Sequence, residues 1–179
     1  IVSLSDSLGK FYRLVLNKGN SETLVTNELD MVRAYLAIQK FRFEERFDAY
    51  FEVDDRVRNC YTLKNILQPL VENALIHGIE PKRSHGTINI KVGLEDDQVV
   101  IRIIDDGVGM ASDKVNDVLE GKNILTNGSG FAIINITRRL KAYYGNNHSM
   151  ELYSKQGIGT VVTLSFTARR LDDVKDANR

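Results

Sequence analysis

The sequence predicts an α/β fold: a two-layer sandwich in which helices cover one face of a mixed, mainly antiparallel sheet. The first observation is that two pairs of stretches alternate apolar and polar side chains across short polar turns, as the strands of antiparallel hairpins do. The second is that segments with apolar residues at helical spacing lie before and between these pairs. Because the apolar face of such a sheet must be covered, we expect the helices to pack on that face.

The first 47 residues predict a helical hairpin. One helix is expected to end at the polar stretch 17–20, and a second to begin at Thr26 or Asn27, either of which can cap it, and to run to about Arg46. Their apolar stripes are Leu4, Leu8, Phe11 and Val15 in the first helix, and Leu29, Val32, Leu36 and Phe43 in the second. These stripes need a partner. Either the hairpin packs on its own domain or it forms a dimer stem, and the sequence leaves both open.

Residues 48–170 predict the sandwich itself. Strands are expected at 49–53, 87–95, 98–105, 150–155 and 160–166, and helices at 63–77, 112–119 and 131–144. Pro69 lies inside the first of these helices and would kink or restart it. The stretch 120–130 is polar and contains glycine, which is typical of a mobile loop. The charged residues 171–179 predict a flexible tail.

Composition excludes several classes of function. Lys plus Arg and Asp plus Glu both total 24, so the formal net charge is zero, which argues against a surface that binds nucleic acid. A single cysteine, Cys60, excludes an intrachain disulfide, and the three histidines lack zinc-ligand spacing. No apolar run approaches the roughly 18 residues of a membrane helix. Because the chain opens on Ile1 within a helical pattern, we expect a piece of a longer protein, whose remainder could hold membrane spans.

Two short stretches carry polar side chains at a spacing that suggests a binding site. Asn73 and His77 are four residues apart and therefore share one face of a helix. An amide oxygen can bind Mg²⁺ and an imidazole can donate to a phosphate or ribose oxygen; the alternative is an exposed Asn and a His at the helix C-terminus. Asp105 ends a strand and precedes Gly107 and Gly109. The alternatives there are a tight turn, or a fixed carboxylate that accepts from adenine beside backbone that a flat ring can approach.

Two further stretches are rich in small residues. The segment 128–132, with Gly130 and Ala132, runs into a helix, and free amides at a helix N-terminus suit phosphates. The segment 157–160 is a hairpin turn that places the hydroxyl of Thr160 at the start of a strand. Each of the four stretches is weak alone, whereas their order and spacing together are specific.

In that order the stretches resemble the GHKL ATP-binding fold, which histidine kinases, Hsp90, type II topoisomerases and MutL share. LQPLVENALIHG resembles the N box, DDGVGM the G1 box, GFAIINITRRL the G2 region and GIGT the last glycine box. The resemblance extends to the LytS/YesM-like class of bacterial sensor histidine kinases. In that class the N box follows a Leu-Gln-Pro-Leu segment, and YLAIQKFRF, at 35–43, looks like the linker helix of the class. The resemblance covers almost the whole chain.

The resemblance implies a role for each matching residue. Asp105 would hold adenine, while Gly107 and Gly109, in the box that ends with Met110, would make room for it. Asn73 would coordinate Mg²⁺, and His77 would donate to phosphate or ribose. Gly130 and Ala132 would present amides to the phosphates, and Thr160 would support Asp105. We interpret Lys122 as a solvated loop lysine, with a phosphate contact as the alternative.

The resemblance also implies the activity. The chain would be the ATP-binding catalytic domain of a protein histidine kinase, which transfers the γ-phosphoryl group of MgATP to a histidine on a helix absent from this sequence, and thence to a response regulator. The intact protein would dimerise through its helical region, and this part would be the cytoplasmic portion of a bacterial membrane protein.

Three departures from the family pattern bear on function. Ile76 stands where the class usually has a lysine, Ala132 replaces a glycine, and no phosphoacceptor box is present. Two alternatives therefore remain open, namely a GHKL-type ATPase and a nucleotide-binding module without catalysis. ATPase members carry a glutamate four residues before the N-box Asn, where this chain has Pro69.

Overall fold

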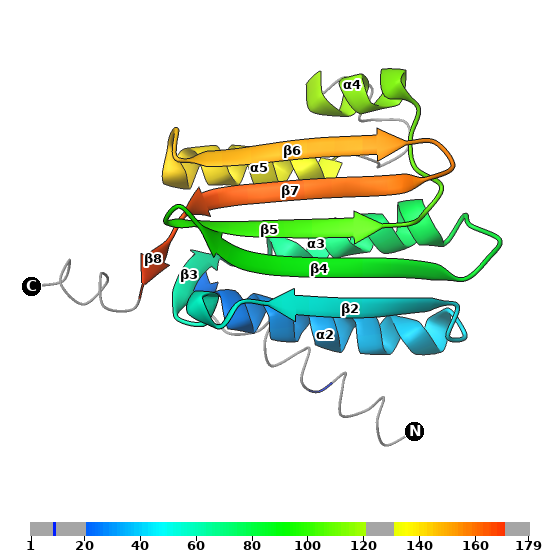
Figure 1. Cartoon of the computed structure of the whole chain (residues 1–179), viewed down its shortest axis with the longest axis horizontal. Coiled ribbons are helices and arrows are strands. Elements are labelled where there is room, and N and C mark those ends of the chain that lie inside the picture. The colour runs from blue at the N-terminus through cyan, green and yellow to red at the C-terminus, as the bar shows by residue number, and fades with distance from the viewer. Residues whose placement is uncertain (1–8, 10–20, 121–130, 171–179) are drawn as a thin grey trace, which may run out of the picture.

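A five-stranded sheet forms one layer of the molecule (Figure 1). The computed structural model describes residues 9, 21–120 and 131–170, so the first predicted helix, the loop with Lys122 and Gly130, and the tail lie outside the described residues. The strands, in spatial order, are β2 (Phe47–Val53), β4 (Gly86–Glu95), β5 (Gln98–Asp105), β7 (Gly159–Thr167) and β6 (His148–Lys155). Only the β2–β4 pair is parallel. The predicted mixed, mainly antiparallel sheet is confirmed.

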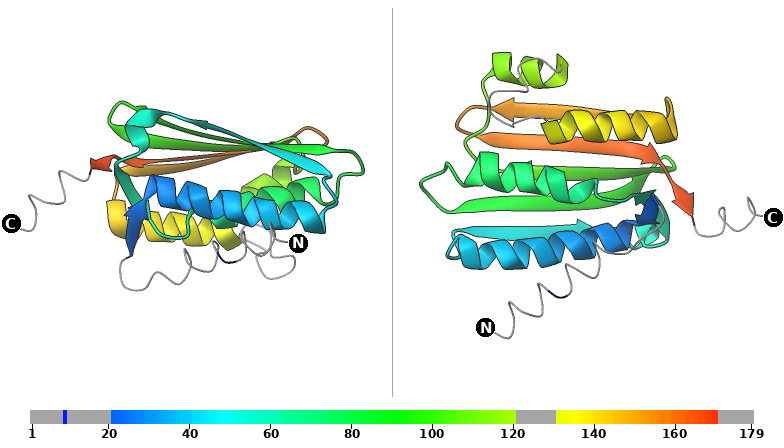
Figure 2. Two further views of the ribbon diagram at one scale, coloured as in Figure 1. Left: turned by 90° about the horizontal axis from the view of Figure 1, so that it is seen from below. Right: turned by 180° about the vertical axis from the view of Figure 1, so that it is seen from behind.

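Helices cover one face of this sheet (Figure 2). They are α2 (Val25–Arg42), α3 (Leu67–Asn73) with the π-helical segment η2 (Ala74–Ile79), and α5 (Phe131–Tyr144). The short helix α4 (Ser112–Glu120) lies beside the edge strand β6 (Figure 1). The molecule is therefore the two-layer sandwich that the alternation of strand and helix patterns predicts.

The core lies between the helices and the inner face of the sheet. Alternate residues of the central strands, such as Ile90, Ile101 and Leu164, are fully buried there. Helix α2 contributes to the same cluster through Leu29 and Val32, each at most 1% exposed. The division of the chain at residue 47 remains a prediction, and α2, on its N-terminal side, shares the buried core with the sheet.

A second, small sheet was not predicted. It consists of β1 (Glu22–Leu24), β3 (Cys60–Leu63) and β8 (Arg169–Arg170), in the order β1-β3-β8. Strands of two to four residues show too little alternation to be recognised without their partners. A 3₁₀ turn, η1 (Asp55–Val57), follows β2.

The predicted helix 63–77 was wrong at its start. Leu63 ends β3, and Asn65 has a φ of 56°, a left-handed conformation that breaks any helix. The helix begins at Leu67, so Pro69 falls in its first turn, where no backbone amide is needed, and causes no kink. The expected cap of the preceding helix was also wrong, because α2 begins at Val25 after Leu24, without a side-chain cap.

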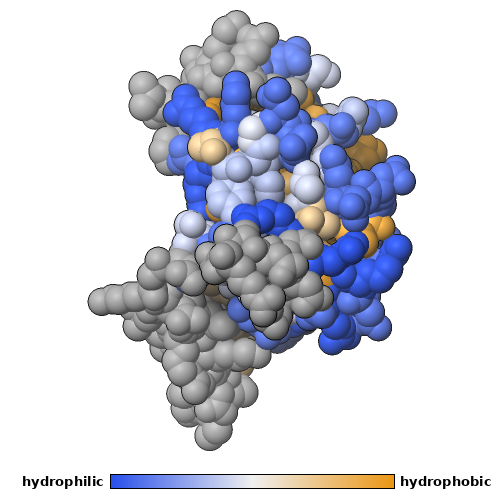
Figure 3. Space-filling view, turned by 90° about the vertical axis from the view of Figure 1, so that its left-hand side faces the viewer, coloured by the Kyte–Doolittle hydropathy of each residue, from blue (hydrophilic) through white to orange (hydrophobic). Residues whose placement is uncertain are grey.

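The end of the sheet where β5 and β6 begin carries mainly hydrophilic side chains with a few separate apolar spots (Figure 3). Among the described residues, none of the helices combines the length and apolar character of a membrane span. The opposite end, where β5 stops at Asp105, holds the cavity described next.

Candidate functional site

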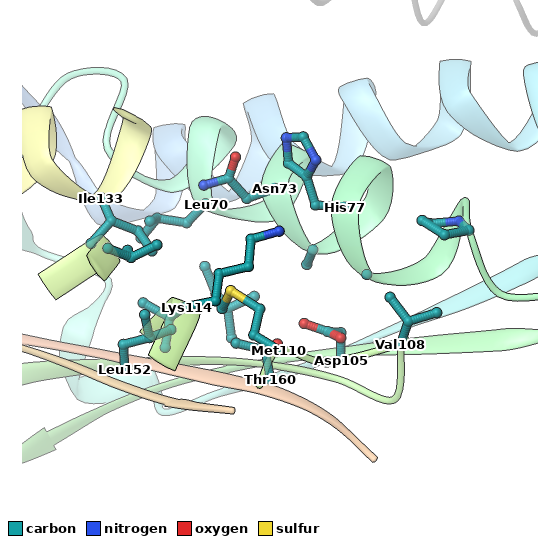
Figure 4. A pocket seen from close by; sticks show the side chains of 17 residues that line it. Leu70, Asn73, His77, Asp105, Val108, Met110, Lys114, Ile133, Leu152 and Thr160 are labelled. Carbon is teal, nitrogen blue, oxygen red and sulfur yellow. The ribbon is translucent and has the colours of Figure 1, made fainter. Parts of the chain in front are cut away.

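A cavity of about 360 Å³ lies at the end of the sheet where β5 stops (Figure 4). Its walls come from α3 and η2, from the end of β5, the start of β7 and strand β6, from the turn after β5, and from helices α4 and α5. Of the predicted site residues, the cavity brings together Asn73, His77, Asp105, Gly109, Met110 and Thr160. Side chains 87 residues apart in the sequence therefore line one space, as the predicted order of motifs requires.

Asp105 is the buried carboxylate of this cavity. It is 6% exposed and its side chain points into the cavity from the end of β5 (Figure 4). Its Oδ1 accepts a hydrogen bond of 2.9 Å from the backbone N–H of Gly107, and the backbone of Thr160 donates to the same carboxylate. Burial raises the pKa of Asp105 to about 6, although these two donors oppose the shift. Because little water competes there, the carboxylate is a strong acceptor for an amine of a ligand.

The glycines beside Asp105 allow three segments to touch. A Cβ atom on Gly78 would lie 2.7 Å from Asp105 Oδ1, and a Cβ atom on Gly107 would lie 2.3 Å from the carbonyl carbon of Gly78. No real Cβ contact is that short, so neither position accepts a side chain without movement. Gly107 therefore leaves space for the backbone of η2, and its predicted role in making room for adenine stays a prediction.

The segment η2 continues the N-box helix as a π-helix. The Glu80 N–H donates to the Leu75 carbonyl at 2.8 Å, and the carbonyl of Gly78, inside this wider turn, accepts from the Val108 N–H at 2.9 Å. Isolated π turns are frequent at functional sites. Here the π turn attaches the helix that carries His77 to the turn that follows Asp105.

The turn after β5 is also bonded to the β6–β7 hairpin. The Gly157 N–H donates to the Val108 carbonyl at 2.7 Å, and the Met110 N–H donates to Ser154 Oγ at 2.8 Å. Ser154 Oγ lies 2.9 Å from the hydroxyl of Thr160. Gly109 has a φ of 61° and its missing Cβ would meet the Lys155 carbonyl, so glycine is required at this crossing. Thr160 thus faces Asp105 through its backbone and Ser154 through its hydroxyl.

Asn73 and His77 lie on the helical side of the cavity, across from Asp105. They occupy successive turns of α3 and η2, as their spacing of four predicts (Figure 4). Asn73 is half-buried and His77 is exposed. The cavity therefore has an acceptor for a base on one side and polar groups for an anion or a metal on the other, and its apolar lining includes Leu70, Ile103 and Val162.

Two predicted residues are placed differently. Gly130 lies outside the described residues, and Ala132 lines a separate hollow between α3 and α5 together with Pro69 and Arg139. The side chain of Ala132 therefore does not share the cavity of Asp105. The predicted role of its amide stays a prediction.

Lys114 in α4 was missed by the sequence analysis. It lines the cavity, and the sequence does contain a signal for this. Lys114 and Val118 are four residues apart on a helix, and Val118 is buried, so Lys114 lies on the inward side of α4. The signal was missed because a lysine after an Asp in a short polar helix resembles an ordinary solvated residue.

The comparisons with known proteins agree with this geometry. The model of one family, described as histidine kinase-, DNA gyrase B-, and HSP90-like ATPase, matches residues 61–170, which include the cavity and most of the sheet. The chain belongs to this family. The model of a second family, described as histidine kinase, matches residues 1–47. The resemblance drawn from the four sequence stretches is confirmed.

Relatives of the chain are named as sensor proteins. The chain is 31% identical over 169 residues to the sensor histidine kinase YesM of Bacillus subtilis, covering 94% of this chain and 28% of that protein. It is 29% identical over 157 residues to the sensor protein LytS of Staphylococcus epidermidis, covering 87% of this chain and 26% of that protein. The chain thus spans about a quarter of the length of these relatives.

A solved structure shows the same fold. The mycobacterial sensor histidine kinase MprB superposes with a TM-score of 0.60 at 16% identity, covering 86% of this chain and 100% of that chain. Because the two sequences are only 16% identical, this likeness shows a shared fold and says nothing about function. The α/β sandwich with helices on one face is therefore the fold of a histidine kinase structure.

Proposed function

We propose that this chain is the ATP-binding catalytic domain of a sensor histidine kinase. It would hold MgATP so that the γ-phosphoryl group can pass to a histidine on another helix, and from there to a response regulator. The observation that carries the proposal is the buried carboxylate of Asp105 in the cavity, with glycine backbone packed against it. Adenine offers an exocyclic amine donor and a flat ring, which match an acceptor beside backbone without side chains.

Magnesium fits the opposite end of the cavity. Asn73 offers an amide oxygen, which is a hard ligand, and Mg²⁺ usually takes only one or two protein ligands together with phosphate oxygens and water. The bound ion would neutralise phosphate charge. Asn73 would hold the ion, and His77 would donate to a phosphate or ribose oxygen.

The side chains that line the cavity support phosphoryl transfer rather than hydrolysis of ATP by water. Among the described residues that line the cavity, Asp105 is the one carboxylate, and it lies at the adenine end. Pro69, which stands where ATPase members have a glutamate, lines the separate hollow between α3 and α5. A kinase needs no base for water there, because its nucleophile is an imidazole from another segment. Catalysis would come from orientation and charge neutralisation.

The proposed cellular location and dimerisation rest on the relatives and on the family match of residues 1–47. YesM and LytS are named as sensor proteins, and the segment 1–47 matches a histidine kinase family model. We therefore place this chain in the cytoplasmic portion of a bacterial membrane protein that dimerises through its helical region.

Calorimetry of MgATP and ADP tests the proposal. Asp105→Ala is expected to weaken binding by at least about ten- to a hundredfold, because a hydrogen bond to a charged group contributes roughly 1.5–3 kcal/mol. Asp30→Ala, which removes an exposed carboxylate on α2, is the control and should bind as the wild type does. Unchanged ADP affinity in Asp105→Ala would show that adenine binds elsewhere.

A further inference from the structure

The described lining of the cavity contains one strong cation. Of the described residues that line it, Lys114 is the one lysine or arginine. Its side chain extends from α4 toward Asn73 and His77, on the side away from Asp105 (Figure 4). The cavity is therefore polarised, with a carboxylate at one end and an ammonium group near the other.

Lys114 is not held by an acid in the described part of the chain. The acids around the site have other partners: Asp106 pairs with Lys82 at 3.0 Å, and Asp105 accepts from backbone N–H groups. The neighbouring Asp113 accepts from the backbone N–H of Lys114, not from its ammonium group. No ion pair within residues 21–120 and 131–170 includes the Lys114 side chain. Within the described residues, its charge can therefore meet an anionic ligand without first leaving an acidic partner.

The position of Lys114 is fixed by packing. Val118, one helical turn later, is 5% exposed and lines the same cavity, and α4 contacts β6 and α5. A ligand-binding side chain on a packed helix loses less freedom on binding than one on a loop. The N-box helix supplies no lysine or arginine to the cavity, since position 76, beside His77, is an isoleucine.

We propose that Lys114 is the phosphate-binding cation of the site and that it sets the preference for ATP over adenosine. The inference rests on the proposed nucleotide function and adds the group that recognises the phosphates. The ammonium group pairs with phosphate oxygens while Asn73 holds the metal on the same side. Lys114 adds nothing to the affinity for a ligand without phosphates, because a base and ribose bound near Asp105 do not reach its ammonium group.

The test compares ligands that differ only in their phosphates. Binding of adenosine, ADP and MgATP is measured by calorimetry for the wild type, Lys114→Ala, Lys114→Arg and Lys141→Ala. Lys141 is an exposed lysine on α5 outside the cavity, so its variant removes the same charge elsewhere. Lys114→Ala is expected to lose about ten- to a hundredfold in MgATP affinity and less than about twofold for adenosine. Lys114→Arg should retain most of the MgATP affinity, and Lys141→Ala all of it.

The outcomes separate this inference from the proposed function. A wild type that binds neither adenosine nor MgATP overturns the nucleotide function and the role of Lys114 with it. A wild type that binds MgATP, with equal affinity in Lys114→Ala, overturns the role of Lys114 alone. Equal losses for adenosine and MgATP in Lys114→Ala would assign the lysine a structural role and would also overturn the inference. Unchanged thermal unfolding of Lys114→Ala is expected, because the side chain is exposed.

Discussion

The carboxylate of Glu28, in α2, accepts a hydrogen bond of 3.0 Å from the backbone N–H of Ile66, immediately before α3. The same carboxylate accepts from Asn65 at 2.8 Å and from Leu67 at 3.2 Å. Glu28 is 2% exposed, and burial raises the pKa of its carboxyl group. On the other side, Arg139 of α5 donates to the carbonyl of Asn65 at 3.0 Å. Two helices thus fix the N-terminus of the helix that carries Asn73.

Glu28→Ala should therefore destabilise the fold strongly. It leaves three backbone donors near the start of α3 without their acceptor, and a buried unsatisfied donor costs about 1–3 kcal/mol. We expect a loss of about 2–4 kcal/mol in the free energy of unfolding, measured by urea denaturation. Asp30→Ala, on the same helix but in an exposed ion pair with Arg33, should change it by less than about 0.5 kcal/mol. Equal stability of the two variants would contradict the capping role.

The Asp105 carboxyl group should make stability depend on pH. Its pKa is raised to about 6 in the folded protein from an ordinary value of 3.8. Between these values the folded state binds the proton that the unfolded state has released, so this contribution to stability is present at low pH and is lost as the pH rises through 6. The loss is on the order of 2–3 kcal/mol.

The difference between the wild type and Asp105→Asn isolates this group. Urea denaturation of both proteins between pH 4.5 and 7 should show the stability of the wild type falling relative to that of the variant as the pH rises. A difference that stays flat over this range would mean that Asp105 titrates alike in both states. The expected fall in stability with pH would identify Asp105 as a residue that serves binding although its charged form destabilises the fold.

Gly107→Ala should disturb the site through contact with η2. The added Cβ would lie 2.3 Å from the Gly78 backbone, so the turn must move away from η2. We expect a loss of about 1–3 kcal/mol in stability and at least tenfold weaker adenosine binding. Gly93→Ala is the matched control, because a Cβ at Gly93 in β4 meets nothing within 4 Å. If Gly107→Ala bound adenosine like Gly93→Ala, the close approach would have no functional importance.

Hydrolysis of ATP by this chain should be very slow. The cavity holds no carboxylate near Asn73 among the described residues, and general-base help is typically worth 10²–10⁴-fold. Steady-state phosphate release should therefore stay far below about 1 s⁻¹, and Glu72→Gln, next to Asn73, should not change it. Turnover near 1 s⁻¹ that disappears in Glu72→Gln would make the chain an ATPase.

The parts of the fold that repeat a local pattern could be predicted from the sequence. The long strands β4 and β5 alternate apolar and polar residues over most of their length and were predicted nearly to their ends. Asp105, with glycines after it, could have been an ordinary tight turn, and it was recognised because the four stretches have a specific order and spacing. Asn73 and His77 were recognised because the helix period places them on one face.

The remaining parts depend on partners that are distant in the sequence. Glu28 resembles an ordinary surface acid of α2, and its partners lie 37 to 39 residues later. Strand β3 exists only because β1 and β8 pair with it, and the left-handed Asn65 after it gives no signal beyond its residue type. Lys114 becomes a cavity residue only when α4 packs beside β6. In each case tertiary contacts decide what local preference leaves open.

The parallel pairing of β2 with β4 bears on how this catalytic unit should be expressed. A fragment cut to the family match at 61–170 would lack β2, so the ten residues of β4 would become an unprotected edge strand. The same cut removes α2 and uncovers the apolar face beneath it. Unpaired backbone groups beside exposed isoleucines favour intermolecular strand addition, so this fragment is expected to aggregate, whereas one that begins at Ser21 should remain monodisperse by light scattering.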